Sequence, residues 1–457
     1  MATTYLSRTF TASATGEEQF TLSMWVKRSG ISATQYLFNA YSDTNNYTGL
    51  YFDSTDKLVF SNSVGGSSTG NLTTNRLFRD TSGFYNIVAV WDSNNGTPGD
   101  RMKLYVNGVE ETSFATDTNP SSGDDSFVGD SGKNCLLGYK GETGFYFNGL
   151  MTHVQLVDSA ALAPTEFGEV DATSGIWKIK TACYATPGTN GFCLKMETTS
   201  GSGMGTDSSG EGNNLTASGT PTQTVDNPSN VFCTINPLNR GDLSNNATLS
   251  NGNTYYSSDT SGYNIRYGTL GASKGKWYWE GKFISHTPTT SAGMPQTISG
   301  ALMPQGVVDS SAINYTYTYG YSGSDGVVQF NSTSSNYGTT ILDTVGQIGM
   351  VAMDLDNNKL YFGVNGVWTN SANPSAGTGA YTIADVTTTP EGFYYPSISD
   401  RSSNRSYVYA WNFGNGYFGT TAVSSAGTSS TDDDSIWEYD CPTAFYGLNT
   451  KNLNTYG

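Results

Sequence analysis

The 457-residue sequence has few charged side chains and only two histidines. Charged residues make up 13% of the chain, which is about half of the usual share in soluble proteins. The 39 acidic residues outnumber the 22 basic ones, so the formal net charge is −17, and no cluster of Lys and Arg interrupts this acidity. Nucleic-acid backbones and anionic lipid surfaces are bound through such clusters. The composition therefore argues against both as partners.

Long apolar runs are also missing. No stretch approaches the roughly 18 consecutive apolar residues of a membrane span, so we expect no membrane insertion. Residues 1–10 lack the basic and apolar regions of a secretory signal peptide. The five cysteines form no CxxC pair, so we expect mostly free thiols and synthesis in a reducing cytoplasm. Whether Cys183 and Cys193 pair across a loop stays open at this point.

Strong helix formers are scarce, and Gly, Ser, Thr, Asn and Tyr take their place. Apolar residues recur with a period of two, as in residues 19–27, where Phe20, Leu22, Met24 and Val26 share one face. Turn clusters separate such runs, and only residues 160–167 have a helical pattern. We therefore predict an all-β protein with two antiparallel β-sandwich (jelly-roll) domains in tandem and very little helix.

Residues 1–168 resemble a laminin-G-like, concanavalin-A-type jelly roll. The similarity lies in residues 20–27, 86–91, 102–108 and 147–156 and in the order in which they occur. We expect residues 169–235 to connect the domains and to add a strand to this first sandwich, which gives a domain of residues 1–235. Because the segment has Gly/Ser-rich stretches, a flexible linker is the alternative interpretation.

A second unit, residues 236–420, resembles the SPRY fold, which is another antiparallel sandwich. The landmarks are residues 275–283, 349–366, 394–398 and 411–414. Residues 421–457 contain Trp437, Tyr439, Phe445 and Tyr446, too many aromatic residues for a free tail. We expect this C-terminal segment to pack on its own subunit or on a neighbouring one.

The order of these modules, together with residues 441–453, resembles virion proteins of marine tailed bacteriophages. That resemblance implies a virion location, synthesis in the host cytoplasm, other virion proteins as partners and a homo-oligomer, with a trimer favoured. One interpretation is a tail fibre or receptor-binding component that contacts host surface glycans. The other is a structural capsid or tail decoration protein, because the sequence has no coiled-coil heptads.

A glycosidase is a third, weaker hypothesis, because the fold is shared but the residues are missing. Such enzymes need two carboxylates that face a cleft, typically on one strand as Glu-x-Asp-x-x-Glu. The nearest match is Glu169-Val-Asp171, followed by Thr173 and Ser174 in place of the second Glu. The histidines, His153 and His286, lack a Gly-x-Ser-x-Gly elbow. We therefore predict that the protein is not an enzyme.

No cofactor is predicted either. Asp354, Asp356 and Asn358 have the opening spacing of a calcium loop, but Asn365 stands where an EF-hand needs Glu. A tight hairpin explains this stretch better, and Ca²⁺ lacks a complete motif.

Tyrosine is abundant, and one run of it predicts a ligand-binding face. A period of two places Tyr315, Tyr317, Tyr319 and Tyr321 on one side of a strand. Phenol rings suit sugars, whose CH faces stack on rings while their hydroxyls meet polar groups. The alternative, which is favoured because this stretch coincides with a core strand of the SPRY-like unit, places these rings between the sheets. Trp368, just after the Asn365-Gly366 turn, is the fifth predicted ligand-binding residue, as an exposed aromatic side chain.

Overall fold

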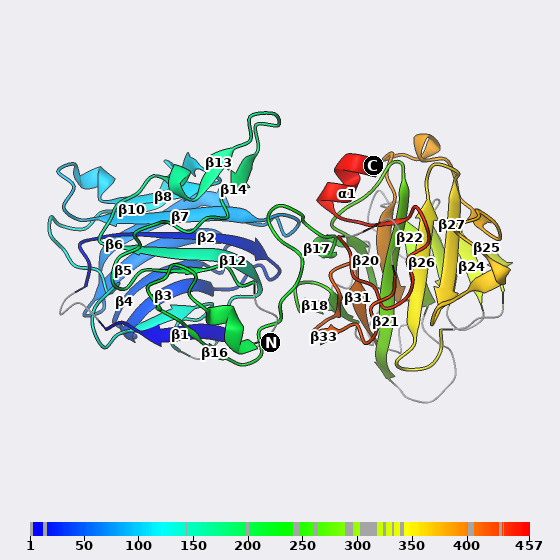
Figure 1. The fold of residues 1–457 in the computed structure, drawn as a ribbon, viewed down its shortest axis with the longest axis horizontal. Coiled ribbons are helices and arrows are strands. Elements are labelled where there is room, and N and C mark those ends of the chain that lie inside the picture. Colours follow the sequence, from blue (N-terminus) through cyan, green and yellow to red (C-terminus); the bar gives the residue numbers. More distant parts are fainter. Residues whose placement is uncertain are drawn as a thin grey trace. The chain divides into compact units, whose positions relative to one another are not determined.

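The computed structural model describes residues 3–11, 16–142, 144–197, 201–240, 247–258, 264–287, 296–301, 318–322, 326–330, 333–338, 342–400, 406–428, 432 and 434–457. The chain forms two compact units, Met1–Gln223 and Thr224–Gly457. Each unit contains two large, mainly antiparallel sheets, so the predicted all-β fold class is confirmed (Figure 1). The division falls after Gln223, so residues 224–235 belong to the second unit and not, as expected, to the first.

The larger sheet of the first unit has eight strands. Their order is β10 (Phe114–Thr118), β6 (Ser67–Leu77), β5 (Lys57–Val64), β4 (Asn46–Phe52), β3 (Gln35–Asp43), β11 (Asn134–Leu137), β1 (Tyr5–Thr9) and β16 (Thr216–Ser218). The smaller sheet has the order β15 (Phe192–Leu194), β12 (Gly149–Asp158), β2 (Gln19–Arg28), β7 (Tyr85–Asp92), β8 (Met102–Val106) and β9 (Val109–Glu110).

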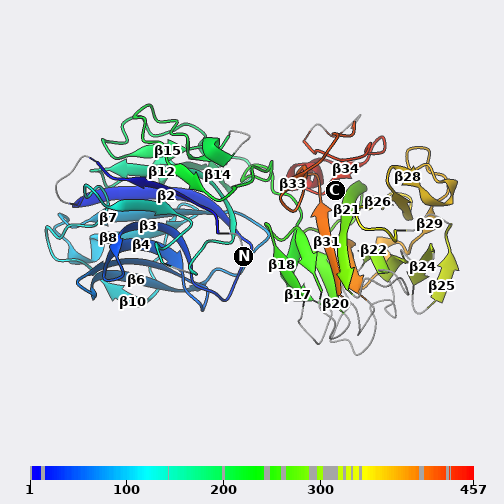
Figure 2. The same ribbon diagram turned by 90° about the horizontal axis from the view of Figure 1, so that it is seen from below.

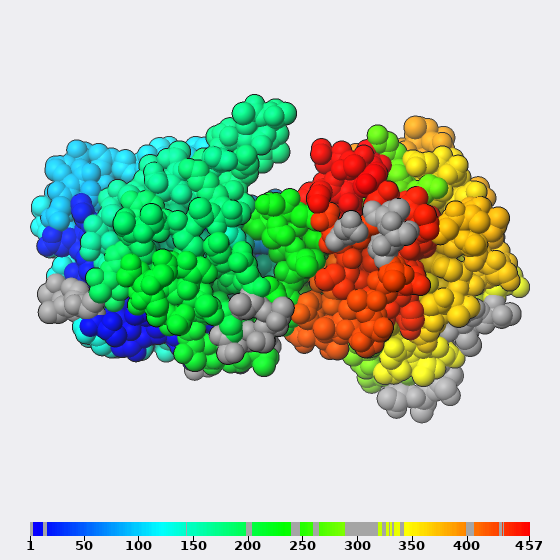
Figure 3. Space-filling view, viewed as in Figure 1, coloured from blue at the N-terminus to red at the C-terminus, as the bar shows by residue number. Residues whose placement is uncertain are grey.

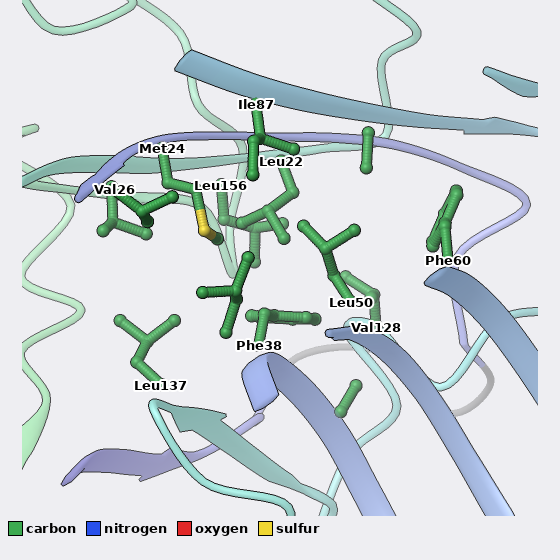
Figure 4. Packing of buried hydrophobic residues seen from close by; sticks show 14 of the residues in the cluster. Leu22, Met24, Val26, Phe38, Leu50, Phe60, Ile87, Val128, Leu137 and Leu156 are labelled. Atoms are coloured by element: carbon green, nitrogen blue, oxygen red, sulfur yellow. The ribbon is translucent and has the colours of Figure 1, made fainter. Parts of the chain in front are cut away.

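The core of the first unit lies between these sheets. On β2, the alternating residues Phe20, Leu22, Met24 and Val26 point into it, as the sequence predicts. Figure 4 shows three of them meeting Phe38 and Leu50 from the opposite sheet.

Residues 169–223 contribute strands to both sheets, since β15 pairs with β12 and β16 pairs with β1. A disulfide joins Cys183 to Cys193, which settles the question that the sequence left open, and the other three cysteines are buried thiols outside this disulfide. Strands β13 (Gly168–Val170) and β14 (Trp177–Ile179) form a separate hairpin that stands out from the sandwich (Figure 1). The expected helix at residues 160–167 is a single 3-10 turn, η2 (Pro164–Glu166).

The second unit repeats the two-sheet plan. One sheet has the order β17 (Ile235–Arg240), β20 (Asn264–Gly268), β30 (Tyr395–Asp400), β22 (Gln296–Ala301), β23 (Thr318–Ser322), β24 (Val327–Phe330) and β25 (Thr333–Asn336). The other has the order β18 (Thr248–Ser250), β19 (Tyr255–Ser257), β31 (Ser406–Asn412), β21 (Lys276–Thr287), β26 (Ile348–Asp354), β27 (Lys359–Val364) and β28 (Val367–Trp368); β29 (Tyr381–Thr382) pairs with β27 and β34 (Tyr446–Gly447) with β21. Figure 2 shows β21 and β31 side by side.

Two Asn-Gly turns have the backbone that tight hairpins require. Asn107 and Gly108 have φ values of 50° and 78°, and Asn365 and Gly366 have 49° and 82°. Positive φ at both central residues is typical of the two-residue turn that matches strand twist.

The C-terminal segment packs on its own unit. Trp437, Cys441 and Phe445 lie on Tyr278 and Tyr361, which point away from the core between the sheets. The chain then ends in α1 (Thr450–Tyr456), where Asn449 caps the N-terminus by accepting a hydrogen bond from the Asn452 backbone at 2.8 Å. These last residues are red in Figure 3 and form part of the surface of the second unit. Among the described residues, no helix has the length and apolar character needed to cross a bilayer.

Candidate functional site

Two of the predicted binding tyrosines lie inside the second sandwich. Tyr319 and Tyr321, on β23, are 3% and 2% exposed. The Tyr319 ring stacks on Phe330 with centroids 4.5 Å apart, and Tyr321 stacks on Phe362 at 5.0 Å. Their side of the strand faces the opposite sheet, so these rings fill the core and form no exposed phenolic face. Tyr315 and Tyr317 lie outside the described residues.

Trp368 is half-buried and is not the exposed side chain that the sequence predicts. Its ring lies 6.3 Å from that of Tyr278, beside the cluster that the C-terminal segment covers. The turn before it is exposed as expected, but the indole folds back against the sheet.

A phenolic face does occur, on the outer side of the eight-stranded sheet of the first unit. We call it the tyrosine face, and it consists of Tyr5, Tyr36, Tyr41, Tyr47, Tyr51, Tyr139 and Tyr146. On β4, Leu50 and Phe52 point into the core, so Tyr47, Gly49 and Tyr51 take the opposite side. Tyr36 is buried and the other six are half-buried, which leaves their edges accessible.

The rings of the tyrosine face form two stacked groups. Tyr36 and Tyr51 are cross-strand partners whose centroids lie 4.4 Å apart at an interplanar angle of 12°. Tyr139 stacks on Tyr146 at 4.5 Å and lies 4.7 Å from Tyr5. Stacking fixes the orientation of the rings before any ligand binds, which lowers the entropy cost of binding.

Loop residues 138–142 and 144–148 cross this face and join the two groups. The backbone N–H of Gly138 donates to the Leu37 carbonyl at 2.9 Å, and that of Phe147 donates to the Gly138 carbonyl at 2.9 Å. From this loop, the Lys140 ammonium lies over the rings of Tyr36, Tyr47 and Phe145, at 5.9, 5.5 and 5.3 Å from their centroids.

Four phenols of this face have a raised pKa. Burial raises the pKa of Tyr51 to about 12, and burial together with the Tyr146 hydroxyl raises the pKa of Tyr139 to about 12. Burial raises the pKa of Tyr36 and Tyr41 as well. A neutral phenol both donates and accepts hydrogen bonds, so the face offers ring surface and hydroxyl groups together.

A second feature of the first unit is a polar pocket without aromatic residues. Its lining is Gly16, Glu17, Glu18, Gln19, Asn94, Asp125 and Ser159. Burial, and the neighbouring Asp158 carboxylate, raise the pKa of Glu17 to about 7, although Ser159 Oγ donates a hydrogen bond to it at 2.9 Å. The pocket lacks a ring on which a sugar could stack, so it is the weaker candidate for a sugar site.

The predicted carboxylate motif lies on the projecting hairpin. Glu169 is 50% exposed, and its carboxylate lies 3.1 Å from Lys178 Nζ, which is also 3.5 Å from Asp171. These carboxylates share a cation and do not line the pocket described above. The motif is therefore a surface ion-pair cluster in this fold.

The histidines and the Asp354 loop have structural partners. Thr152 Oγ1 lies 3.1 Å from His153 Nδ1, and the His286 ring stacks on Phe283. Asp354 pairs with Lys276 at 3.0 Å, and Asp356 accepts the Gly275 N–H at 2.8 Å, as in a tight hairpin. No group of three or more His, Cys, Asp or Glu side chains suited to a metal ion occurs in the described part of the chain.

Sequence reasoning missed the tyrosine face, although it expected phenol rings to bind sugars. The available signal was Tyr47-Thr-Gly-Leu-Tyr51, in which two tyrosines flank a glycine on one side of a strand. The contribution of residues 138–142 and 144–148 had no comparable signal, because their position over the sheet depends on tertiary packing.

Residues 2–166 match the family described as the concanavalin A-like lectin/glucanases superfamily. The first unit therefore has the concanavalin A-like jelly-roll fold, as its resemblance implied. A search of curated proteins found no matching relative.

Several solved structures are similar to parts of the chain. The SPRY domain of human HERC1 is 14% identical, with a TM-score of 0.29, over 39% of this chain and 96% of that one. The native heptameric SAP-like pentraxin from Limulus polyphemus is 19% identical, with a TM-score of 0.24, over 35% and 72%. Domain 4 of AbnA, a GH43 extracellular arabinanase from Geobacillus stearothermophilus solved with arabinotriose, is 19% identical, with a TM-score of 0.26, over 33% and 65%. These likenesses concern the fold alone.

Proposed function

We propose that the protein is a non-catalytic glycan-binding protein of a phage virion surface, and that the tyrosine face is its binding site. The observation that carries the proposal is the gathering of seven tyrosines on one outer sheet face of a lectin-like unit. The accessible edges of these rings offer apolar contact to the CH groups of sugars, and the phenol hydroxyls exchange hydrogen bonds with sugar hydroxyls. The virion assignment, with a tail fibre as the location, rests on the sequence resemblance.

The binding site is tested with the whole chain on an array of bacterial surface glycans. We expect Tyr47→Ala and Tyr51→Ala to weaken binding about tenfold each, because each removes a stacking ring and a hydroxyl. The matched control is Tyr105→Ala, on β8, because this half-buried tyrosine packs on the outer side of the other sheet. Equal binding by all four proteins would exclude the tyrosine face as the site.

Host attachment is tested separately. The purified chain should bind host cells and block phage adsorption, and Tyr51→Ala should lose both effects. Failure of the unmutated chain in both assays would exclude a receptor-binding role.

A structural decoration protein is the second candidate, and the projecting hairpin favours it. Val170 and Ile176 on this hairpin are 61% and 67% exposed, and in this proposal they supply the apolar contact with another virion protein. Val170→Ser with Ile176→Ser should then prevent incorporation into particles while glycan binding is unchanged. If the double variant is incorporated normally, attachment through the hairpin is excluded.

A further inference from the structure

Lys140 places a positive charge over two rings of the tyrosine face, those of Tyr36 and Tyr47. Its ammonium lies within 6 Å of three ring centroids, and its closest charged neighbour is Glu142, whose Oε1 is 3.0 Å away. We propose that Lys140 makes the face selective for glycans that carry an anionic substituent, a carboxylate or a sulfate. This inference rests on the proposed function and names the substrate class of the same site.

Both ends of Lys140 are held in place. Asn39, a fully buried residue of β3, donates a hydrogen bond from its side-chain amide to the Lys140 carbonyl. The side chain is 15% exposed, because the rings of Tyr36, Tyr47 and Phe145 surround its ammonium. Fixing a free lysine side chain costs about 2 kcal/mol of rotamer entropy. Because Lys140 is already fixed in the folded protein, ligand binding does not add this cost.

The ammonium keeps the capacity to bind a ligand. It has three N–H donors, and Glu142 accounts for one ionic partner. The Glu142 side chain is 27% exposed, but the Oε1 atom that faces Lys140 is buried and accepts no hydrogen bond from the described residues, so an anion on a bound sugar can take its place as the hydrogen-bond acceptor of Lys140. Ring faces stabilise the cation but offer no strong acceptor, which leaves an anion as the partner that completes its coordination.

The charge of the whole chain strengthens this assignment. At −17 the protein repels polyanions at long range, so an acidic glycan needs a local cation in order to bind. A neutral glycan has no such need, and for a neutral ligand a lysine in place of a further ring would only remove stacking surface. The position of the Lys140 ammonium over the rings of Tyr36, Tyr47 and Phe145 therefore fits acidic glycans better than neutral ones.

The test compares oligogalacturonate with its carboxyl-reduced neutral form, and a sulfated galactan with its desulfated form, by calorimetric titration of the whole chain. We expect each anionic form to bind about tenfold more tightly than its neutral partner. Lys140→Gln should abolish this difference, and Lys140→Arg should keep most of it. Glu142→Gln should strengthen binding of the anionic forms about threefold, because it removes the competing carboxylate. Lys178→Gln, which changes the net charge equally on the distant hairpin, should behave as the unmutated chain.

Each outcome decides a different point. If the unmutated chain binds neutral and anionic forms equally, or if Lys140→Gln keeps the preference, the role of Lys140 is overturned while glycan binding stands. If Glu142→Gln weakens binding of the anionic forms, the competition model is also overturned. If neither form of either glycan binds, the proposed function fails together with the inference.

Discussion

Glu280 on β21 accepts a hydrogen bond from the backbone N–H of Tyr439 at 2.9 Å, so a strand near the start of the second unit holds the C-terminal segment. The same carboxylate accepts the N–H of Glu438 at 3.0 Å, the Tyr278 hydroxyl at 3.0 Å and the Asn412 amide at 3.2 Å. Four donors meet one fully buried carboxylate, and two of them belong to the C-terminal segment. Loss of this segment would leave Glu280 without half of its partners.

The first prediction concerns the pH dependence of this contact. Burial raises the pKa of Glu280 from its ordinary 4.5 to about 7, although all four hydrogen bonds oppose the rise. Because the folded pKa exceeds the unfolded one, the contribution to stability is fully present below about pH 4.5 and is lost as the pH rises through about 7. The second unit should therefore be about 2.5 kcal/mol less stable at pH 8 than at pH 5 from this group. Chemical denaturation, monitored by tryptophan fluorescence, measures the difference.

Glu280→Gln is the control for this prediction, because glutamine does not titrate in this range. The difference in stability between pH 5 and pH 8 should shrink by the amount that Glu280 contributes. Equal pH dependence in both proteins would show that the burial of Glu280 does not control the stability of the second unit.

The second prediction is that Trp437→Ala loosens the C-terminal segment. Trp437 is completely buried, and its ring lies 4.8 Å from that of Tyr278. Removing it should cost about 3 to 5 kcal/mol, as in other buried Trp→Ala changes, and should expose the segment to limited proteolysis. The neighbouring Ile436→Ala, which alters an exposed side chain, should have little effect. Resistance of Trp437→Ala to proteolysis would mean that other contacts hold the segment.

The sequence predicts the fold well where apolar residues alternate along a strand, as in β2, and where a turn needs positive φ, as at Asn365-Gly366. It fails for the tyrosine face because β3 contains a bulge between Tyr36 and Phe38. The bulge turns both Leu37 and Phe38 into the core, so Tyr36 and Asn39 share the outer side although their spacing is odd. In a regular strand, Tyr36 and Asn39 would lie on opposite sides. No residue type in this stretch predicts the bulge.

Glu280 shows the same limit. In residues 275–283 a single Glu within an apolar strand looks solvent-facing, because it alternates with the core residues Trp277 and Trp279. Its burial depends on a segment more than a hundred residues later, which no local pattern predicts.

The third prediction concerns the Cys183–Cys193 disulfide, which closes a loop with a sequence separation of 10 residues. By loop entropy, its reduction should lower the stability of the first unit by about 2 to 3 kcal/mol. Thermal unfolding with and without a reductant measures this change, and Cys183→Ser with Cys193→Ala should reproduce it. The buried, free Cys135 should be unaffected, so Cys135→Ala should respond to the reductant as the unmutated chain does. Full alkylation of Cys183 and Cys193 in the untreated native protein would contradict the disulfide.

The fourth prediction is that the polar pocket has no catalytic activity. This pocket is the strongest candidate for an active site in the first unit. Glu17, with its pKa raised to about 7, could remain protonated near neutral pH as a general acid does, and Asp125 lines the same pocket. Burial raises the pKa of Asp125 too, and no ring is present to hold a sugar over the pair. We therefore expect no release of reducing sugar from any glycan that the chain binds, and no change in Glu17→Gln or Glu169→Gln. Release that Glu17→Gln abolishes, while Glu169→Gln retains it, would make the pocket an active site and the protein a glycosidase.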